Sequence, residues 1–192
     1  MSKIALTPNA SGSGTFTIAA PNSDTDRSLT LPDGAGTLDR LERAGNVLQV
    51  VSSTRNTAYS TTSTSYVSPD GLSVTITPSS TSSKILVVFE GKGGSATGHG
   101  LNVRLEKDGT GINLASGQTF GQQVNIPVSP DQNRHYHSAS MMYLDSPATT
   151  SSITYRLALA SSGGGEVTLN TRQIIPSTAI GTSTITVMEI AG

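Results

Sequence analysis

The strongest constraint on the fold is a pattern of alternating apolar and polar residues within positions 138–160, SASMMYLDSPATTSSITYRLALA. Two apolar runs, 141–144 and 153–159, flank a loop at 145–152 that contains Pro147. In the second run every other residue is apolar, and because side chains alternate between the faces of a strand, one face is apolar and the other more polar. Proline cannot donate to a neighbouring strand, and Ser and Thr hydroxyls compete for backbone groups, so the loop separates two strands. The pattern predicts a long β-hairpin in the middle of a β-sandwich.

The composition favours strands and predicts a thin core. Hydrophobic residues make up 34% of the 192 residues, and charged residues 13%, whereas globular domains usually contain ~45–50% apolar residues when glycine is counted. Abundant Ser and Thr with few charges suit short strands and turns, while disordered chains usually carry more charge and less β-branched alternation. We therefore expect a partner surface to complete the burial. Identical chains are the expected partner, because most soluble assemblies are closed homo-oligomers.

Charge and targeting signals argue against several partners. The net charge is −1 and the pI is about 6.3, so no global field attracts nucleic acid or anionic lipid. The first ten residues, MSKIALTPNA, lack the apolar region of a signal peptide, and no ~20-residue apolar run could span a membrane. The chain contains no cysteine, which leaves neither disulfides nor thiolate metal sites. We expect a chain that is made and folded in a cytoplasm, with no nucleic-acid partner and no membrane insertion.

Residues 1–37 read as a separate segment. Short strands are predicted at 15–19 and 27–32, each with two apolar residues on one face, and turn residues at 32–36 close the unit. Two apolar residues per strand cannot stabilise an isolated hairpin in water. This segment is expected to intertwine with copies of itself or to dock on another protein.

Residues 38–46, LDRLERAGN, are the one helical candidate. Thr37 or Asp39 could cap the start of the helix, and Gly45 with Asn46 supplies a stop signal. One or two turns are too short to be stable alone. Packed around an axis shared by several copies, this segment could serve as a short collar.

Residues 47–192 are expected to form an all-β domain. Besides the two strands of 138–160, strands are predicted at 47–53, 58–68, 72–76, 83–91, 101–106, 112–115, 167–171 and 185–190, with 118–134 as a long loop and Lys107-Asp-Gly109 as a hairpin turn. The run 83–91 is apolar on both faces, which indicates a central strand covered on both sides, with Val87 in its middle. A change of phase after Val187 indicates a bulge or burial on both faces. Eight to ten strands suit a jelly roll.

Several stretches resemble proteins of tailed-bacteriophage virions. The N-terminal pattern TPNASGSGTFTIAAPNSDTDRSLTLPDGAGTL is similar to the attachment segment of tail-fibre and related virion proteins, in which TIAAP and LTLPD strands precede variable heads. Three later stretches, GLSVTITPSSTSSKILV, DSPATTSSITYRLAL and GTSTITVMEIAG, resemble a phage head domain, while the central region 92–137 is unmatched. The resemblance implies a homotrimeric appendage with an N-terminal β-rich stem and a C-terminal jelly-roll head, the trimer being similar to those of TNF and C1q.

The resemblance also implies a role. We expect a non-enzymatic virion structural protein, assembled in the host bacterial cytoplasm. It would be a homotrimeric tail fibre that attaches to tail, baseplate or capsid proteins through residues 1–46 and contacts a host-surface glycan or protein with its head, residues 47–192. The alternative is a capsid decoration or head-fibre trimer with the same fold.

Histidines are the only candidate metal ligands that the sequence singles out. His135 and His137 lie on the same face of an extended strand, and three copies around an axis could offer six nitrogens to an octahedral metal, as in some phage fibres that resemble this pattern. The alternative is a solvated or hydrogen-bonded pair. His99, between two glycines, is a weaker candidate. We assign no metal or cofactor to the chain.

No catalytic constellation is evident. A glycosidase would need two carboxyls ~5–9.5 Å apart across a cleft lined by rings that stack on sugars, yet the chain has no Trp, three Phe and five Tyr. Turn geometry is the better explanation of Asp33, Asp70 and Asp108, and no nucleophile triad, P-loop or dinucleotide fingerprint is present. The candidate receptor surfaces are the loops 91–100, 118–134 and 145–152, because recognition usually lies on loops of a rigid scaffold.

Overall fold

The computed structural model describes residues 11–15, 17, 19, 22, 24–26, 28, 43–96, 98–125, 137–171, 178 and 181–192. The chain divides into two compact units, Met1–Leu38 and Asp39–Gly192. The described residues of the first unit belong to no strand, and most of the strands predicted at 15–19 and 27–32 lie outside the described residues. The predicted collar also lies outside them up to residue 42. Arg43–Asn46 form a turn, in which the Asn46 N–H donates to the Arg43 carbonyl at 3.0 Å.

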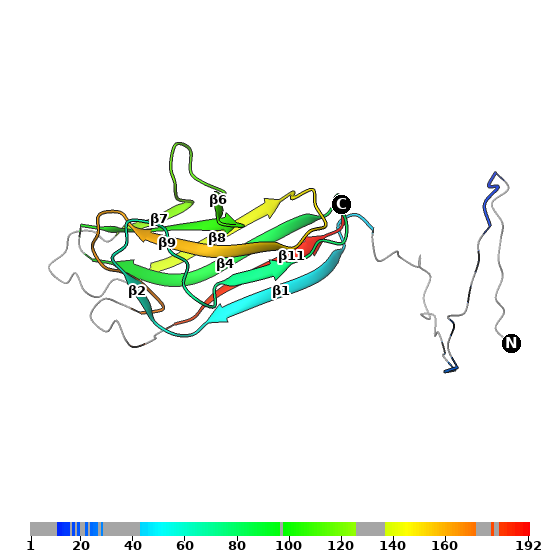
Figure 1. Ribbon diagram of the computed structural model, residues 1–192, viewed down its shortest axis with the longest axis horizontal. Helices are drawn as coiled ribbons and strands as arrows, with labels where there is room; N and C mark the ends of the chain where they lie inside the picture. Colours follow the sequence, from blue (N-terminus) through cyan, green and yellow to red (C-terminus); the bar gives the residue numbers. More distant parts are fainter. Residues whose placement is uncertain are drawn as a thin grey trace. The chain divides into compact units, whose positions relative to one another are not determined.

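The described part of the second unit contains eleven strands in two antiparallel sheets (Figure 1). Sheet A is built from β1 (Val47–Arg55), β2 (Tyr59–Thr61), β4 (Lys84–Ser95), β8 (His137–Asp145), β10 (Val167–Leu169) and β11 (Ser183–Ile190). Sheet B is built from β3 (Ser73–Ile76), β5 (Gly100–Lys107), β6 (Thr110–Ile112), β7 (Gln122–Asn125) and β9 (Ile153–Ser161).

The strand order is that of a jelly roll. In sheet A the main strands lie in the order β1-β11-β4-β8, and β10 pairs with β4 beyond the part that β11 occupies. In sheet B the order is β3-β9-β5, with β6 and β7 paired to successive parts of β5. Numbered along the chain, the eight strands β1, β3, β4, β5, β7, β8, β9 and β11 give orders 1-8-3-6 and 2-7-4-5, the connectivity of two Greek keys folded into a jelly roll. The predicted all-β class and β-sandwich are confirmed.

The core lies between the sheets and explains the strand alternation. On β4, Ile85, Val87 and Phe89 are fully buried against sheet B, whereas Leu86 and Val88 point to the outer side of sheet A and are partly exposed. On β9, Tyr155 and Leu157 are fully buried. The two apolar faces predicted for 83–91 therefore exist. One of them forms the core, and the other is the outer face of sheet A.

The predicted 138–160 hairpin is wrong. β8 pairs with β4 in sheet A, and β9 pairs with β3 and β5 in sheet B. The loop between them carries the chain from one sheet to the other. An apolar inner face can be buried whether two strands lie side by side in one sheet or face each other across the sandwich, so the alternation did not determine the pairing. In the structure β8 and β9 lie in opposite sheets, with both inner faces in one core.

Three further predictions need correction. The loop predicted at 118–134 contains β7, which pairs with β5, and the strand predicted at 58–68 shortens to β2 with an isolated bridge from Val67 to Leu159. β11 pairs with β4 without a shift, but its register with β1 shifts between Val47 and Gln49, opposite Ile190 and Glu189, so the irregularity predicted here lies on β1. Along β11 itself, Met188 and Ile190 face outward while Glu189 faces inward. The apparent phase change arises because a buried carboxylate occupies a position where the alternation predicted an apolar residue.

The sandwich has two distinct ends. At the proximal end the chain enters from the N-terminal side and the C-terminal strand stops: the Gly45 N–H donates to the Ala191 carbonyl at 2.8 Å (Figure 1). The 77–83 and 146–152 connections also lie at this end, since Lys84 and Asp145 begin and end their strands here. At the distal end lie the 96–99 and 162–166 turns, joined by a hydrogen bond from the Ala96 N–H to the Glu166 carbonyl at 2.7 Å.

Candidate functional site

The outer face of sheet A carries apolar rows that cross its main strands. Strand pairing aligns one row of four apolar residues, Val50, Met188, Leu86 and Leu144. The next row toward the distal end aligns Ser52, Thr186, Val88 and Met142. We define the apolar patch as Val47, Val50, Leu86, Val88, Met142, Leu144, Met188 and Ile190.

The apolar patch is open to solvent within the described structure. Met142 is 67% exposed, Val50 57%, Val47 50% and Leu144 49%. The patch members on β4 and β11 are partly buried by their neighbours in the sheet. Single exposed apolar side chains are ordinary on a protein surface, but contiguous rows of them mark interaction surfaces.

Beyond the apolar patch, the same face becomes polar toward the distal end. The following row aligns Thr54, Thr184, Glu90 and Ser140, and the row after it pairs Lys92 with Ser138. A shallow depression of about 330 Å³ lies here, lined by Glu90, Gly91, Lys92, Gly181, Thr182 and Thr184. The outer face of sheet A is thus divided into an apolar proximal half and a polar distal half.

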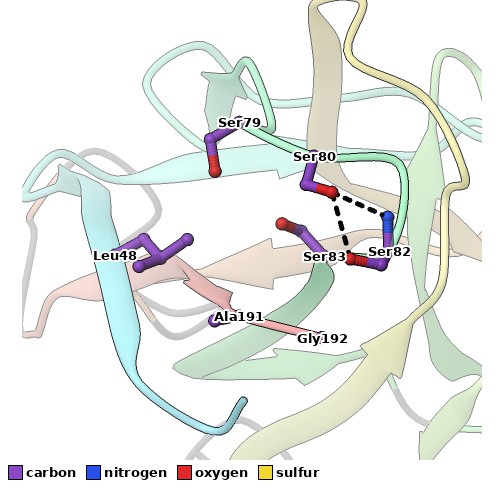
Figure 2. A pocket seen from close by; sticks show the side chains of 7 residues that line it. All are labelled: Leu48, Ser79, Ser80, Ser82, Ser83, Ala191 and Gly192. Carbon is purple, nitrogen blue, oxygen red and sulfur yellow. Dashed lines mark hydrogen bonds between the residues drawn. The ribbon is translucent and has the colours of Figure 1, made fainter. Parts of the chain in front are cut away.

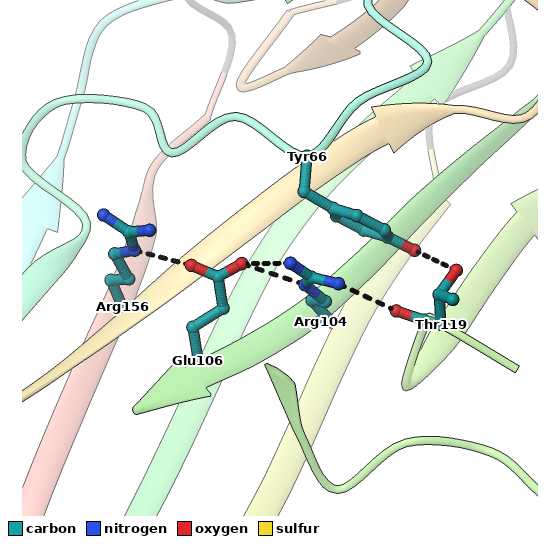
Figure 3. Close-up of polar contacts among 5 residues, drawn as sticks. All are labelled: Tyr66, Arg104, Glu106, Thr119 and Arg156. Carbon is teal, nitrogen blue, oxygen red and sulfur yellow. Dashed lines mark hydrogen bonds and ion pairs between the residues drawn. The ribbon is translucent and has the colours of Figure 1, made fainter. Parts of the chain in front are cut away.

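The outer face of sheet B has a different chemistry, dominated by one buried carboxylate. Glu106 on β5 is 2% exposed and bridges two guanidinium groups. Its Oε1 accepts from Arg104 Nε at 2.9 Å, and its Oε2 accepts from Arg156 Nε at 2.6 Å (Figure 3). The β5–β9 register places Arg156 directly opposite Glu106, so the pair is fixed by the backbone.

An aromatic ring completes this cluster. Tyr66 lies over Arg104, with 3.7 Å between the guanidinium carbon and the ring centroid (Figure 3). The segment that carries Tyr66 is held on the sheet by hydrogen bonds between Val67 and Leu159 and from the Ser161 N–H to the Ser63 carbonyl. The charges of this face are therefore paired with one another, and the 63–67 segment covers part of it.

A second buried carboxylate, Glu189, points inward at the proximal end. It accepts hydrogen bonds from Gln49 Nε2 at 2.5 Å and from both the backbone N–H and the hydroxyl of Ser79 at 2.7 Å. Burial by itself raises the pKa of Glu189, but the hydrogen bonds, that of Gln49 foremost, outweigh it and lower the pKa to about 2. The ionised carboxylate anchors the β3–β4 connection to β1 and β11.

A depression of about 280 Å³ lies beside this connection (Figure 2). Four of its seven lining residues are serines, with Leu48, Ala191 and Gly192 on the other side. The Ser80 and Ser82 hydroxyls lie 3.0 Å apart, and the Ser82 N–H donates to Ser80 Oγ at 3.2 Å (Figure 2). These hydroxyls form the internal bonds of a serine-rich turn, so we read the depression as a product of that turn.

Asp145 closes the proximal end of the core. Its Oδ2 accepts from the Tyr155 hydroxyl at 2.6 Å and from Lys107 Nζ at 2.9 Å. Burial and the hydrogen bond to Asp145 both raise the pKa of Tyr155 above its ordinary value. The neutral Tyr155 phenol and the Lys107–Asp145 ion pair thus satisfy one another's polar groups where β5 and β8 end and β9 begins.

The three candidate receptor loops do not lie together. Most of 91–100 belongs to strands β4 and β5, which leaves a tight turn at the distal end. Of 118–134, the structure describes residues up to 125, which run toward the distal end in β7. The loop 145–152 lies at the proximal end, beside the start of β4. Only the first two share an end of the sandwich.

The histidines and turn aspartates take ordinary positions where they are described. His137 is the exposed first residue of β8, and His135 lies outside the described residues, as does Asp33. His99 packs against Gly163 and Gly165, where an added Cβ would collide with its ring. Asp108, in the turn between β5 and β6, accepts from the Thr154 N–H at 2.9 Å.

The described residues contain neither a metal-ligand cluster nor a membrane-spanning helix. Within residues 43–96, 98–125, 137–171 and the other described positions, no group of three or more His, Asp or Glu side chains is placed to hold a metal ion. None of the described elements is a helix long and apolar enough to cross a membrane.

No protein-family model matches the chain, and the search of curated proteins found no match. The candidate function therefore depends on the geometry above and on the resemblance carried by the sequence patterns.

Proposed function

We propose that this chain is a non-enzymatic bacteriophage virion protein, a homotrimeric tail fibre whose N-terminus attaches to the particle and whose C-terminal head contacts the host surface. The observation that carries the proposal is the two-ended jelly roll. The chain enters at the proximal end, where Gly45 bonds to Ala191, and two of the three candidate receptor segments run to the distal end. A rigid sandwich with anchorage at one end and turns at the other suits an adhesion module.

Trimer formation adds to this role. A head that contacts a repetitive host surface gains from copies held together, because each further contact becomes intramolecular and weak contacts become cooperative. The low share of hydrophobic residues and the open apolar patch both favour assembly of copies over a single chain.

Labelling of the chain in intact virions tests the location. Gold-conjugated antibody against the jelly-roll unit is expected to decorate the tail of the particle, whereas decoration of the capsid surface would replace the tail-fibre role by that of a capsid or head fibre. Absence of label from particles would overturn the virion role altogether.

A deletion tests the division of labour. Removal of residues 1–42 keeps the Gly45–Ala191 hydrogen bond and every described strand, so we expect a strand-rich far-ultraviolet spectrum and loss of attachment to particles. The isolated jelly-roll unit should still adsorb to host cells. If adsorption is lost when residues 1–42 are removed, the receptor contact lies in the N-terminal segment, and the proposed division of roles is wrong.

A further inference from the structure

We infer that the apolar patch and the polar rows beyond it form the contact between copies of this chain, so that the outer face of sheet A turns inward in the assembly. This inference rests on the proposed homotrimer and assigns its surface. It uses the strand register, the exposure of the patch and the position of the N-terminal connection.

The size of the face fits an interface with a second copy. The apolar patch spans four strands ~4.8 Å apart and about six residues at ~3.4 Å each, a footprint of ~400 Å². This is the size of the largest apolar patches on monomers, ~300–600 Å², and about half of the ~800 Å² that each partner contributes to a standard interface. The contact must therefore extend beyond the patch, and the Glu90 and Lys92 rows on the same face supply a polar rim.

A second copy covers the patch better than the chain's own N-terminal segment does. The strands predicted at 15–19 and 27–32 offer Phe16, Ile18, Leu29 and Leu31, half as many apolar side chains as the patch presents. Another copy offers eight. Copies that meet through this face with parallel strands also bring their Arg43–Asn46 connections to the same end, since the patch begins at Val47. The N-terminal segments are then adjacent, as a shared stem requires.

Charge on the face is complementary between copies. Glu90 and Lys92 are exposed on the outer face of β4, two residues apart, and make no ion pair with each other. Around an axis parallel to the strands, Glu90 of one copy and Lys92 of the next differ in height by only ~7 Å, a distance that two long side chains can span. Such rim pairs contribute more to register than to affinity.

The central test places a charge in the patch and measures assembly of the full-length chain. By light scattering, wild-type protein is expected at three times the 19.7 kDa chain mass. Met142→Lys changes a residue that is 67% exposed, so the fold should be retained while the trimer dissociation constant rises at least 100-fold. The matched control is Leu114→Lys, at a 40% exposed leucine in the β6–β7 connection of sheet B, which should leave the trimer unchanged.

Cross-linking gives a readout that does not depend on the stability of the lysine variant. The chain has no native cysteine, so Leu144→Cys and Leu114→Cys each introduce a single thiol. Treatment with a bifunctional thiol reagent should cross-link copies through position 144 and leave position 114 unlinked. In a third arm, Glu90→Lys and Lys92→Glu should each weaken assembly about threefold to tenfold, and the double variant should restore it.

The outcomes separate this inference from the proposed function. A trimeric wild-type chain in which Met142→Lys and Leu144→Cys behave like their position-114 controls overturns the interface alone. Failure of the Glu90/Lys92 double variant to restore assembly overturns the charge pairing alone. A monomeric wild-type chain overturns both the interface and the homotrimer, whatever the location of the protein in the virion.

Discussion

The outer face of sheet B keeps its charges paired: Glu106 is buried between Arg104 and Arg156, and the segment around Tyr66 lies over them. The outer face of sheet A instead presents apolar rows that the described residues leave open, with Met142 67% exposed. Both faces belong to antiparallel sheets that share one core. Among the described residues, one side of this sandwich has its charges paired and partly covered, while the proximal half of the other side presents apolar rows typical of an interior.

The largest expected effect comes from placing a charge at an inward-facing position of β4, in comparison with an outward-facing position of the same strand. Val87 is fully buried toward the core, and Val88 faces outward on the same strand. Val87→Asp should destabilise the fold by on the order of 5 kcal/mol, because the carboxylate is desolvated without a partner. Val88→Asp should cost the isolated jelly-roll unit less than ~1 kcal/mol and act on assembly instead.

Urea unfolding at low protein concentration, combined with light scattering, measures both effects. Equal loss of secondary structure in the two variants would mean that the outer face of sheet A is as essential to the single chain as its core. The sequence predicted that 83–91 is covered on both sides, with Val87 in its middle. In the structure Val87 packs among the core residues of its own chain, so its side chain stabilises the single fold.

The next largest effect concerns the outer face of sheet B. Glu106→Ala leaves two guanidinium groups without their carboxylate. Breaking a fully buried ion pair typically costs ~3–5 kcal/mol, but the Arg104 and Arg156 side chains are 19% and 40% exposed and regain water in the variant, so we expect ~2–3 kcal/mol. Glu90→Ala is the matched change on the outer face of sheet A and should cost under ~1 kcal/mol, because Glu90 is exposed. Similar unfolding midpoints for the two variants would remove the contrast between the faces.

An intermediate effect is expected on the inner side of sheet A. Glu189→Gln removes the charge that Gln49 and Ser79 hydrogen-bond, at a cost of ~1.5–3 kcal/mol near pH 7. Because the folded-state pKa lies below the ordinary 4.5, the ionised carboxylate stabilises the fold above pH 4.5, and this contribution is lost as the pH falls toward about 2. The urea midpoints of wild type and variant should therefore converge as the pH falls across that range. A constant difference between the two midpoints would show that the charge of Glu189 does not stabilise the fold.

The smallest effect tests how firmly the cover on sheet B is held. Tyr66→Leu removes the ring over Arg104 and should destabilise the fold by ~0.5–2 kcal/mol. Tyr66→Phe keeps the ring and should stay within ~0.5 kcal/mol of wild type, since the hydroxyl contact to Thr119 is long at 3.5 Å. A larger loss in the Phe variant than in the Leu variant would assign the effect to the hydroxyl.

Sequence periodicity predicted the class and most strands because it reports which side chains must leave water. The alternation at 153–159 and the double apolar face of 83–91 correspond to β9 and β4. The Lys107-Asp-Gly109 turn also forms as predicted, with φ of +49° at Asp108 and +84° at Gly109, backbone angles that Gly and Asp tolerate best. β7 was missed because its sequence, QQVN, contains a single apolar residue.

What the tertiary structure alone decided is pairing. Periodicity assigns a face to each side chain but not a neighbour to each strand, so 138–160 was read as a hairpin although β8 and β9 lie in different sheets. The same limit hid the apolar patch, whose members come from four strands aligned by register, and the Arg104–Glu106–Arg156 cluster, whose members come from two. Long-range strand order depends on how both inner faces fit into one core, and no local stretch of sequence encodes that fit.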